Sequence, residues 1–289
     1  AEAVALEAAG AAARGATLYV SLEPCAHQSQ RGPACADLVA ASGLAQVVVG
    51  CGDPDPRTAG SGIARIRQAG IAVEQIDNPA CTASLEGYLT RAHRGRPHVT
   101  LKLALSLDGC IAMASGESQW ITGAEARAHG HLLRAGIDAI LVGGGTLRSD
   151  QPRLDVRLVD TARQPLRVVL DSRLELAPGA RIVQPPGEVL VYTAQPLGTD
   201  TAHLTAQGVT VVSCPEASRP TVDLAAVLRD LARRGVNELH LEAGHKLNAS
   251  FLQAGLVDEL LVYLAPMLMG PGAGMAALGP FTAIDQSLR

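Results

Sequence analysis

The first residues whose types and spacing could do chemistry are two cysteines, Cys25 and Cys35, in a stretch that begins SLEPCAH at Ser21. Cys35 is expected at the start of a helix, and a helix N-terminus favours the thiolate, the form of cysteine that binds metal. Two thiolates and one imidazole would bind zinc and leave the fourth tetrahedral position open for water, as catalytic zinc requires. Zinc acidifies that water, and a nearby carboxylate can carry its proton. The two cysteines therefore predict a catalytic zinc site.

This arrangement resembles the zinc nucleobase deaminases, whose signature is His-x-Glu, then Pro-Cys, then Cys. The nine residues between the cysteines, with His27 among them, point more narrowly to the deaminase half of the bifunctional riboflavin-pathway deaminase–reductases, although the loop is about one residue longer here. The resemblance implies Glu2 as general acid/base, Cys25 and Cys35 as Zn²⁺ ligands, and His27 as a residue lining the pyrimidine pocket. It also places the remaining ligand, a histidine, immediately before Ala1. We therefore expect a chain shortened at both ends, with weak zinc binding and no deaminase activity when it starts at Ala1.

Other interpretations of these residues stay open. A Pro-Cys pair is often only a buried cysteine, and a glutamate near the start of a chain is often solvated. His27 could be a third zinc ligand, but its separation from Cys25 by one residue makes a shared tetrahedral geometry awkward. Cys51 and Cys81 are expected to be core cysteines.

Four motifs mark the second part of the chain: LKLALSLDG at 101–109, SGESQWIT at 115–122, GGGTLRSDQP at 143–152 and EAGHKLN at 242–248. Glycine-containing turns from strand to helix present backbone N–H groups that can bind phosphate. GGGT is not the dinucleotide fingerprint, because Arg148 stands where GxGxxG requires glycine. Trp120 is either a core residue or a wall against a flat cofactor ring.

Taken as a set, the four motifs resemble the reductase half of the same bifunctional family, which has a dihydrofolate-reductase-like fold. The resemblance implies NADPH contacts at Ala104, Trp120, Thr146, Asp150, Ser172, Gly244, His245, Lys246, Leu247, Asn248, Ala249 and Ser250. It implies substrate contacts at Ser118, Arg134, Leu154, Arg157 and Glu242, with Lys102 beside them. Lys102, Asp150 and Glu242 are the candidates for proton supply. His245 and Lys246 depart from the usual small or Pro-Thr pair, and Lys246 would add attraction for the cofactor phosphates.

The family resemblance implies two reactions in riboflavin biosynthesis. The first is zinc-dependent hydrolytic deamination of 2,5-diamino-6-ribosylamino-4(3H)-pyrimidinone 5′-phosphate. The second is NADPH-dependent reduction of the ribosyl side chain to ribityl, giving 5-amino-6-(5-phosphoribitylamino)uracil. One alternative is a reductase with an inactive deaminase-like domain. Another is a non-enzymatic, zinc-stabilised protein that binds NADPH without turnover.

Alternating helix and strand patterns must position these residues. Before residue 96 we predict a helix to about Gly15 and helices over 33–42, 61–70 and 82–95, with strands over 16–23, 45–50 and 71–76. After it, strands are predicted over 98–106, 137–145, 165–172, 188–193, 209–213, 238–244 and 258–268, and helices from Thr122, where Glu125 completes a capping box, and over 221–235. This rhythm predicts mostly parallel sheets covered by helices. We expect a cytidine-deaminase-like three-layer α/β domain over 1–93, a linker, and a dihydrofolate-reductase-like α/β domain over 97–289.

Composition excludes several classes of partner. The net charge is −4, the lysines and arginines are scattered and aromatic residues make up 2 %, which argues against nucleic acid. No apolar run approaches the roughly 20 residues of a membrane span, and no signal peptide is evident. Six cysteines in 289 residues indicate a reducing cytoplasm. We expect a small phosphorylated pyrimidine as the partner, and the family implies a homodimer or larger homo-oligomer.

Overall fold

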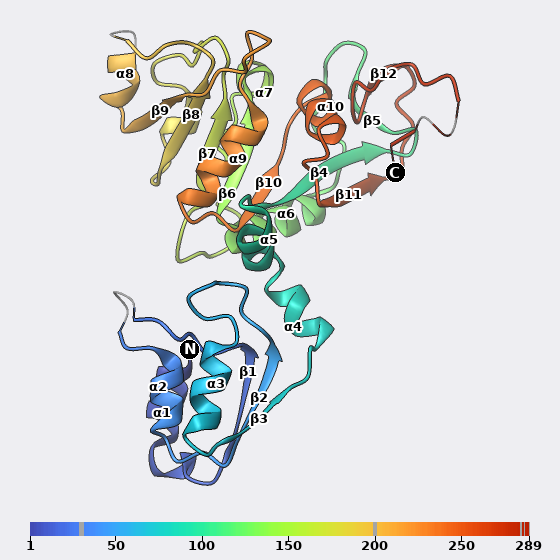
Figure 1. Cartoon of the computed structure of the whole chain (residues 1–289). Coiled ribbons are helices and arrows are strands. Elements are labelled where there is room, and N and C mark those ends of the chain that lie inside the picture. The colour runs from blue at the N-terminus through green and yellow to red at the C-terminus, as the bar shows by residue number, and fades with distance from the viewer. Residues whose placement is uncertain (29–31, 199–200, 284, 286, 289) are drawn as a thin grey trace. The chain divides into compact units, whose positions relative to one another are not determined.

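The computed structural model describes residues 1–28, 32–198, 201–283, 285 and 287–288. The chain divides into two compact units, Ala1–Arg94 and Gly95–Arg289 (Figure 1). Part of the predicted loop between the two cysteines, residues 29–31, lies outside the described residues. In the part of the chain that the structure describes, no helix is both long and apolar enough to cross a membrane.

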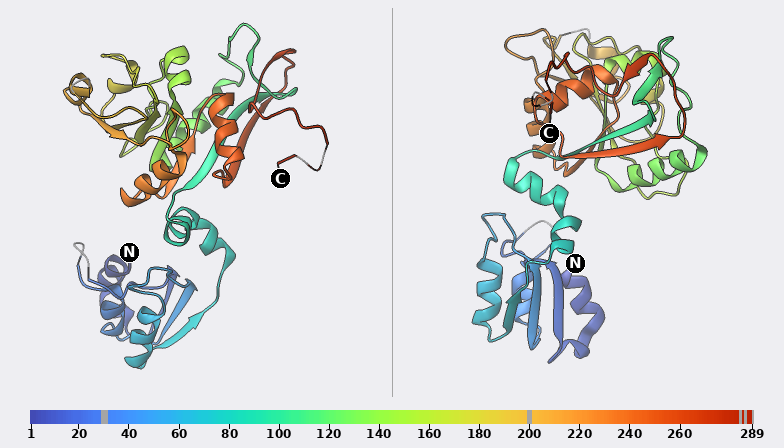
Figure 2. Two further views of the ribbon diagram at one scale, coloured as in Figure 1. Left: turned by 45° about the horizontal axis from the view of Figure 1, so that its top comes forward. Right: turned by 90° about the vertical axis from the view of Figure 1, so that its right-hand side faces the viewer.

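The first unit is built on three parallel strands in the order β1-β2-β3. Helices α1, α2 and α3 lie together beside this sheet (Figures 1 and 2). Their apolar side chains meet Val47 and Val49 of β2 in one core. The elements are α1 (Glu2–Ala9), the 3₁₀ helix η1 (Gly10–Ala13), β1 (Thr17–Leu22), α2 (Cys35–Ala40), β2 (Gln46–Cys51), α3 (Ser61–Gln68), β3 (Ala72–Gln75), α4 (Pro79–Ser84) and α5 (Glu86–Arg94).

Helix α4 packs against β2 at Gly50. A Cβ atom at this glycine would lie 2.5 Å from Sγ of Cys81 and 2.7 Å from the carbonyl oxygen of Ser21, so no side chain fits. Cys51 is buried and Cys81 is half-buried. Helix and strand can therefore approach this closely only because residue 50 is a glycine.

Helix boundaries in this unit differ from the predicted ones. The predicted helix to Gly15 ends its α-helical part at Ala9, and the predicted helix over 82–95 is two helices, α4 and α5. Helix α4 begins earlier because Asn78 caps it, with Oδ1 accepting from the N–H of Ala80 at 2.8 Å, and Pro79 occupies its first turn.

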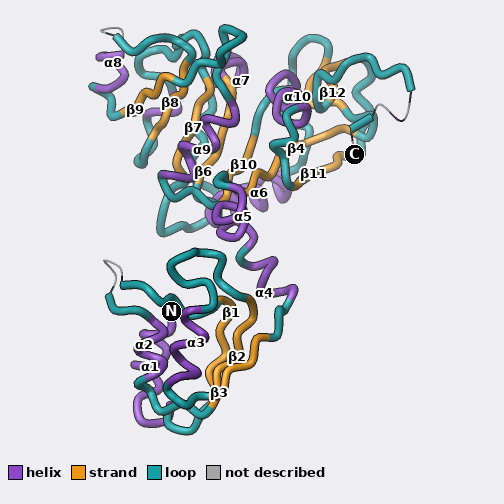
Figure 3. Tube along the Cα trace, viewed as in Figure 1, coloured by secondary structure: helices purple, strands orange, loops and turns teal. Residues whose placement is uncertain are grey.

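The second unit contains a seven-stranded, all-parallel sheet in the order β11-β4-β10-β6-β7-β8-β9. A two-stranded antiparallel sheet of β5 and β12 stands beside it (Figure 3). The strands are β4 (His98–Ser106), β5 (Cys110–Met113), β6 (Ala139–Gly143), β7 (Leu166–Leu170), β8 (Val189–Thr193), β9 (Val209–Ser213), β10 (Glu238–Leu241), β11 (Glu259–Ala265) and β12 (Gly272–Gly274).

Strands β6, β7 and β8 in the middle of the large sheet are buried on both faces, which explains why they are mainly apolar runs. Leu141 of β6 belongs to the core that includes Leu228 of α9 and Phe251 of α10, whereas its neighbours Ile140 and Val142 belong to a second core on the opposite face. The helices are α6 (Ala124–Gly136), α7 (Gly144–Asp150), η2 (Arg181–Val183), α8 (Ala202–Thr205), α9 (Leu224–Arg233) and α10 (His245–Gln253).

The predicted capping box at Thr122 is wrong. Helix α6 begins at Ala124 after Gly123, and that residue makes no side-chain cap hydrogen bond. The carbonyl of Thr122 instead accepts from Nη1 of Arg127 at 2.8 Å, so the backbone just before the helix is tied to its second turn. Because the strands are parallel, the turns that follow β4, β10, β6 and β7 share one edge of the sheet, where ligands bind in α/β folds.

Candidate functional site

Glu2, Cys25 and Cys35 lie close together in the first unit. The backbone N–H of Cys35, the first residue of α2, donates to Sγ of Cys25 at 3.3 Å. Burial, followed by hydrogen bonds with Glu2 and Cys25, raises the pKa of the Cys35 thiol to about 12. The fold thus brings Glu2 close to Cys25 and Cys35, which lie 23 and 33 residues further along the chain. Among the described residues, however, no group of three or more His, Cys, Asp and Glu side chains is arranged to hold a metal ion.

His27 faces a threonine. Its Nδ1 lies 3.2 Å from Oγ1 of Thr58, which also accepts from the N–H of Ala26 at 3.3 Å. The described residues therefore give no support to His27 as a third ligand beside the two cysteines. They place its ring against the loop that follows β2 instead.

A buried carboxylate that the sequence analysis missed holds this loop. Glu23 is 3 % exposed and accepts backbone N–H groups from Asp53 at 3.3 Å, Gly60 at 3.0 Å and Ile63 at 3.0 Å. At Gly62 an added Cβ would lie 2.1 Å from the carbonyl oxygen of Pro24, so helix α3 is held directly against the Pro-Cys turn. The sequence feature that could have identified Glu23 is its position at the end of an apolar strand, directly before Pro-Cys.

A second buried carboxylate continues the same loop. Asp53 is 7 % exposed, and its Oδ1 accepts from the hydroxyl of Tyr88 in α5 at 2.6 Å and from the N–H of Asp55 at 2.9 Å. Burial and the hydrogen bond to Asp53 raise the pKa of Tyr88. Glu23 and Asp53 together fix the backbone that presents Thr58 to His27.

In the second unit, an ion pair follows β10. Arg134 of α6 holds the carboxylate of Glu242 with two hydrogen bonds, Nε–Oε1 at 2.9 Å and Nη2–Oε2 at 2.6 Å. Nζ of Lys102 in β4 lies 3.9 Å from the same carboxylate and 5.6 Å from the centre of the Tyr263 ring. Burial alone would raise the pKa of Glu242, but the positive charges and hydrogen bonds of Arg134, with Lys102, lower it to about 2. Glu242 is therefore a carboxylate at neutral pH.

A buried histidine adjoins this ion pair. The backbone N–H of Arg157 donates to Nδ1 of His131 at 3.3 Å, so this nitrogen acts as an acceptor. Burial and the charges of Arg134 and Arg157 lower the pKa of His131 to about 4, which keeps the ring neutral. Nη1 of Arg157 also pairs with Asp155 at 2.9 Å. The structure thus brings Lys102, Arg134, Arg157 and Glu242 into one connected set.

Two further predicted substrate residues lie elsewhere in this region. Leu154 is 4 % exposed, adopts a positive φ of 55° and packs in the core with Ile140 and Leu147. Ser118 is half-buried in the segment before α6.

A large cleft of about 1010 Å³ is lined by the turn that begins at Gly244, two residues after Glu242, but not by the four charged side chains of this set. Seven of the predicted cofactor residues line it: Thr146, Ser172, Gly244, His245, Lys246, Leu247 and Ser250. At the base of the cleft Gly143 packs closely against Leu247, because a Cβ at Gly143 would lie 3.0 Å from Cδ2 of Leu247. Turns after β6, β7 and β10 form its base, and arginines 148 and 219 stand on its walls.

The other predicted cofactor residues do not line the cleft. Asn248 and Ala249 lie on the buried face of α10, and Nδ2 of Asn248 donates to the carbonyl of Met275 at 2.8 Å. Asp150 is exposed at the end of α7, and Ala104 is half-buried in β4. Trp120 is 64 % exposed, and the guanidinium of Arg127 lies 4.5 Å from its ring centre.

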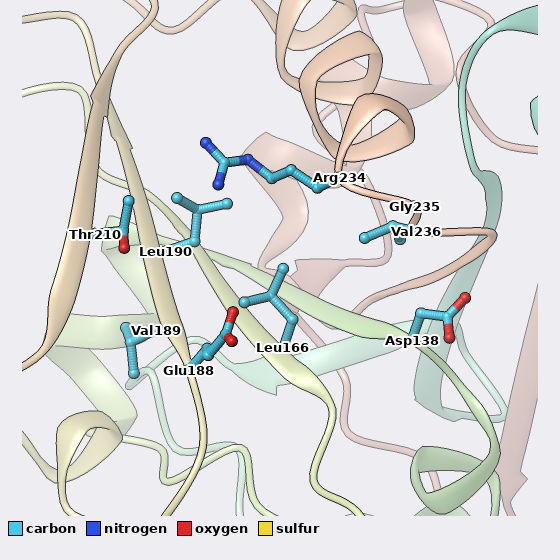
Figure 4. A pocket seen from close by; sticks show the side chains of 9 residues that line it. All are labelled: Asp138, Leu166, Glu188, Val189, Leu190, Thr210, Arg234, Gly235 and Val236. Atoms are coloured by element: carbon cyan, nitrogen blue, oxygen red, sulfur yellow. The ribbon is translucent and has the colours of Figure 1, made fainter. Parts of the chain in front are cut away.

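A smaller hollow of about 250 Å³ lies where the strands begin (Figure 4). Two of its charged groups already have partners: Arg234 pairs with Asp230 at 2.7 Å, and Asp138 pairs with Arg163 at 3.1 Å. Ligand sites usually exceed roughly 300 Å³ and present unengaged polar groups. The large cleft is therefore the better candidate. The residues lining the small hollow are Asp138, Leu166, Glu188, Val189, Leu190, Thr210, Arg234, Gly235 and Val236.

Comparison with known proteins gives a consistent result. Residues 97–288 match the model of the RibD C-terminal domain. Riboflavin biosynthesis protein RibD of Escherichia coli K12 is 42 % identical over 286 residues, which is 94 % of this chain and 76 % of that protein. The structure of Acinetobacter baumannii RibD, form 1, is 38 % identical, with a TM-score of 0.88 over 100 % of this chain and 80 % of the other.

A second solved structure carries a more detailed name. The Thermotoga maritima diaminohydroxyphosphoribosylaminopyrimidine deaminase/5-amino-6-(5-phosphoribosylamino)uracil reductase is 32 % identical, with a TM-score of 0.82 over 95 % of this chain and 75 % of that one. The family model, the identity to curated relatives and the shared α/β fold agree, and the chain belongs to the RibD family of riboflavin biosynthesis enzymes and carries its reductase domain.

Proposed function

We propose that this protein reduces the ribosyl side chain of 5-amino-6-(5-phosphoribosylamino)uracil to ribityl with NADPH, and that its first unit performs the preceding zinc-dependent deamination. The observation that carries the proposal is the 1010 Å³ cleft, lined from Gly244 onward, in a chain that has the RibD C-terminal domain and the Lys102–Glu242–Arg134 set at the same strand β10 and its neighbours. A dinucleotide in the cleft and a phosphorylated pyrimidine over the ion pair would share one edge of the sheet.

The lining of the cleft fits a dinucleotide. Helix α10 starts at His245 after Gly244, so its N-terminal N–H groups and the positive end of its dipole face the cleft, as phosphate groups require. Lys246 adds a cation to the same turn. NADPH, when bound, supplies the hydride.

The reduction also needs a proton, and the charges of the site favour one donor. Glu242, with a pKa of about 2, carries no proton at neutral pH. Asp150 is exposed at the end of α7, where its Oδ1 accepts from the hydroxyl of Ser149 at 2.7 Å. Lys102 is the remaining candidate, because its ammonium group lies 3.9 Å from Glu242 at the carboxyl end of the sheet. We assign it the transfer of a proton to the substrate nitrogen, while the carboxylate of Glu242 orients substrate hydroxyl or N–H groups.

In the first unit, Cys25 and Cys35 suit zinc because two thiols meet at a helix start, with a carboxylate alongside. Zinc, when bound, supplies an acidified water. Glu2 would move a proton from the nucleophile to the departing ammonia, since its carboxylate reaches Cys35. His27, held by Thr58, would line the pyrimidine side.

Two variants test the two reactions separately, each made in a chain that carries the zinc-ligand histidine expected before Ala1. Lys102→Met should abolish substrate-dependent loss of nicotinamide absorbance but leave ammonia release and zinc content unchanged. Cys35→Ser should do the reverse. NADPH that binds but is never oxidised with substrate would sink the reductase assignment. Reduction without ammonia release or zinc in the wild-type protein would establish the alternative, a reductase with an inactive deaminase-like unit.

A further inference from the structure

The strand order sets the direction in which a dinucleotide must lie in the cleft. The Lys102–Glu242 pair marks β4 and β10 as the reacting end. The cleft is lined by the turns after β10, β6 and β7, from Gly244 to Ser172. From β4 to β7 there are three inter-strand steps, roughly 14 Å. The reduced ring has to lie at the β4 end, so the adenosine of the cofactor must lie at the β7 end.

Two arginines from separate elements line the cleft, and the ion pair of Arg148 with Glu175 places that arginine beside the turn after β7. Arg148 comes from α7, and Arg219 comes from the loop between β9 and α9. The acidic residues of the same wall have other partners. Glu216 accepts from the hydroxyls of Ser218 at 3.2 Å and Thr221 at 2.8 Å, while the Asp223 carboxylate caps α9. Arg148 and Arg219 are therefore the groups of this wall that can bind a phosphate.

We propose that Arg148 and Arg219 select the phosphorylated dinucleotide by binding the phosphate on its adenosine ribose. This inference rests on the proposed function of the cleft. NADPH and NADH differ only in that phosphate. Arginine is suited to it because its planar guanidinium can donate two parallel hydrogen bonds to phosphate oxygens.

The present partner of Arg148 makes it available for this role. Nη1 of Arg148 lies 2.5 Å from Oε2 of Glu175, and the two side chains are 58 % and 39 % exposed. Exposed ion pairs contribute little, so a doubly charged phosphate can replace the carboxylate. Arg173 shares the same glutamate at 3.7 Å, but it is 80 % exposed and does not line the cleft.

The experiment measures binding of NADPH and of NADH, and turnover with each, for the full chain and for Arg148→Ala, Arg219→Ala and the double variant. Arg173→Ala is the matched control, since it removes the same charge from the same neighbourhood. We expect the wild-type protein to prefer NADPH about 100-fold, and the double variant to lose at least about 10-fold of that preference through weaker NADPH binding alone. The control should keep the preference, and Glu175→Gln should strengthen NADPH binding.

Three outcomes would overturn the inference. If the double variant keeps the preference for NADPH and still oxidises it, the two arginines do not select the phosphate, and the proposed function of the cleft is unaffected. An equal loss of NADPH and NADH binding means that they contact the shared part of the cofactor. Failure of either dinucleotide to bind the wild-type protein removes both the inference and the proposed function on which it rests.

Discussion

In residues 1–94 the buried carboxylate of Glu23 accepts three backbone N–H groups, whereas in residues 95–289 the carboxylate of Glu242 is paired with two side-chain cations. Glu23 thereby fixes the path of a loop and leaves no acceptor directed at a ligand. Glu242 fixes a charge between its neighbours Arg134 and Lys102. The difference indicates that the first site depends on backbone order, while the second depends on charge balance.

The largest effect that would sharpen this contrast is expected from Arg134→Ala. The change leaves Glu242, 14 % exposed, without its bidentate partner. An uncompensated charge at such a site costs about 4 kcal/mol of unfolding free energy. Urea unfolding of the second unit measures the loss. Arg134→Lys keeps the charge but not both hydrogen bonds, and it should lose less than half as much. Equal stability of Arg134→Ala and wild type would show that charge balance does not govern this site.

The second prediction concerns pH and also belongs to the second unit. His131 has a pKa lowered from 6.5 to about 4 by burial, Arg134 and Arg157, against the opposing charges of Glu242 and Asp155. Between these two pH values His131 is protonated in the unfolded chain but stays neutral in the native state. The contribution of His131 to the free energy of unfolding should therefore be fully present above pH 6.5. About 3 kcal/mol of unfolding free energy should be lost as the pH falls towards 4.

His131→Asn tests this pH dependence, because its side-chain oxygen can still accept from the N–H of Arg157 but does not titrate. The variant should show a flatter stability profile between pH 6.5 and 4, whatever its absolute stability. A slope equal to that of the wild-type protein would assign the acid sensitivity to other groups.

The same contrast explains what could be predicted from the sequence. Strands such as 98–106 and 209–213 matched the structure because β-branched and apolar residues that alternate with polar ones are typical of strands. The grouping of Arg134 with Glu242, 108 residues apart, could not follow from local pattern. Glu23 was missed for the same reason, since its partners lie 30 to 40 residues further along the chain. Sequence motifs identified candidate residues such as Arg134 and Glu242, but only the three-dimensional structure shows which residues they contact.

The third prediction returns to the first unit. Glu23→Ala leaves the N–H groups of Asp53, Gly60 and Ile63 without their acceptor. Water can reach the space left by the side chain, so the loss of unfolding free energy should be limited to about 2 kcal/mol. Glu23→Gln should recover part of this loss, because its amide oxygen still accepts hydrogen bonds from backbone N–H groups. Differential unfolding of the two units gives the measurement. Ammonia release should fall with the Ala variant while NADPH oxidation persists, and a loss of both would contradict the separation of the sites.

The smallest predicted effect is that of Tyr88→Phe. The change removes the 2.6 Å hydrogen bond to Oδ1 of Asp53, but the N–H of Asp55 still donates to that oxygen. We therefore expect a loss of about 1 kcal/mol, the usual contribution of one hydrogen bond. Tyr19→Phe is the matched control, because Tyr19 is 75 % exposed in the same unit and should change nothing.

Function gives the sharper measurement for Tyr88→Phe. If backbone order governs the first site, loosening the 52–60 loop should weaken the hold of Thr58 on His27. KM of the deamination step should then rise a few-fold with kcat nearly unchanged, because substrate contacts and not the reacting groups are disturbed. A fall in kcat at constant KM would mean instead that Asp53 acts on the reaction itself, and the contrast between a site ordered by its backbone and a site ordered by charge would fail.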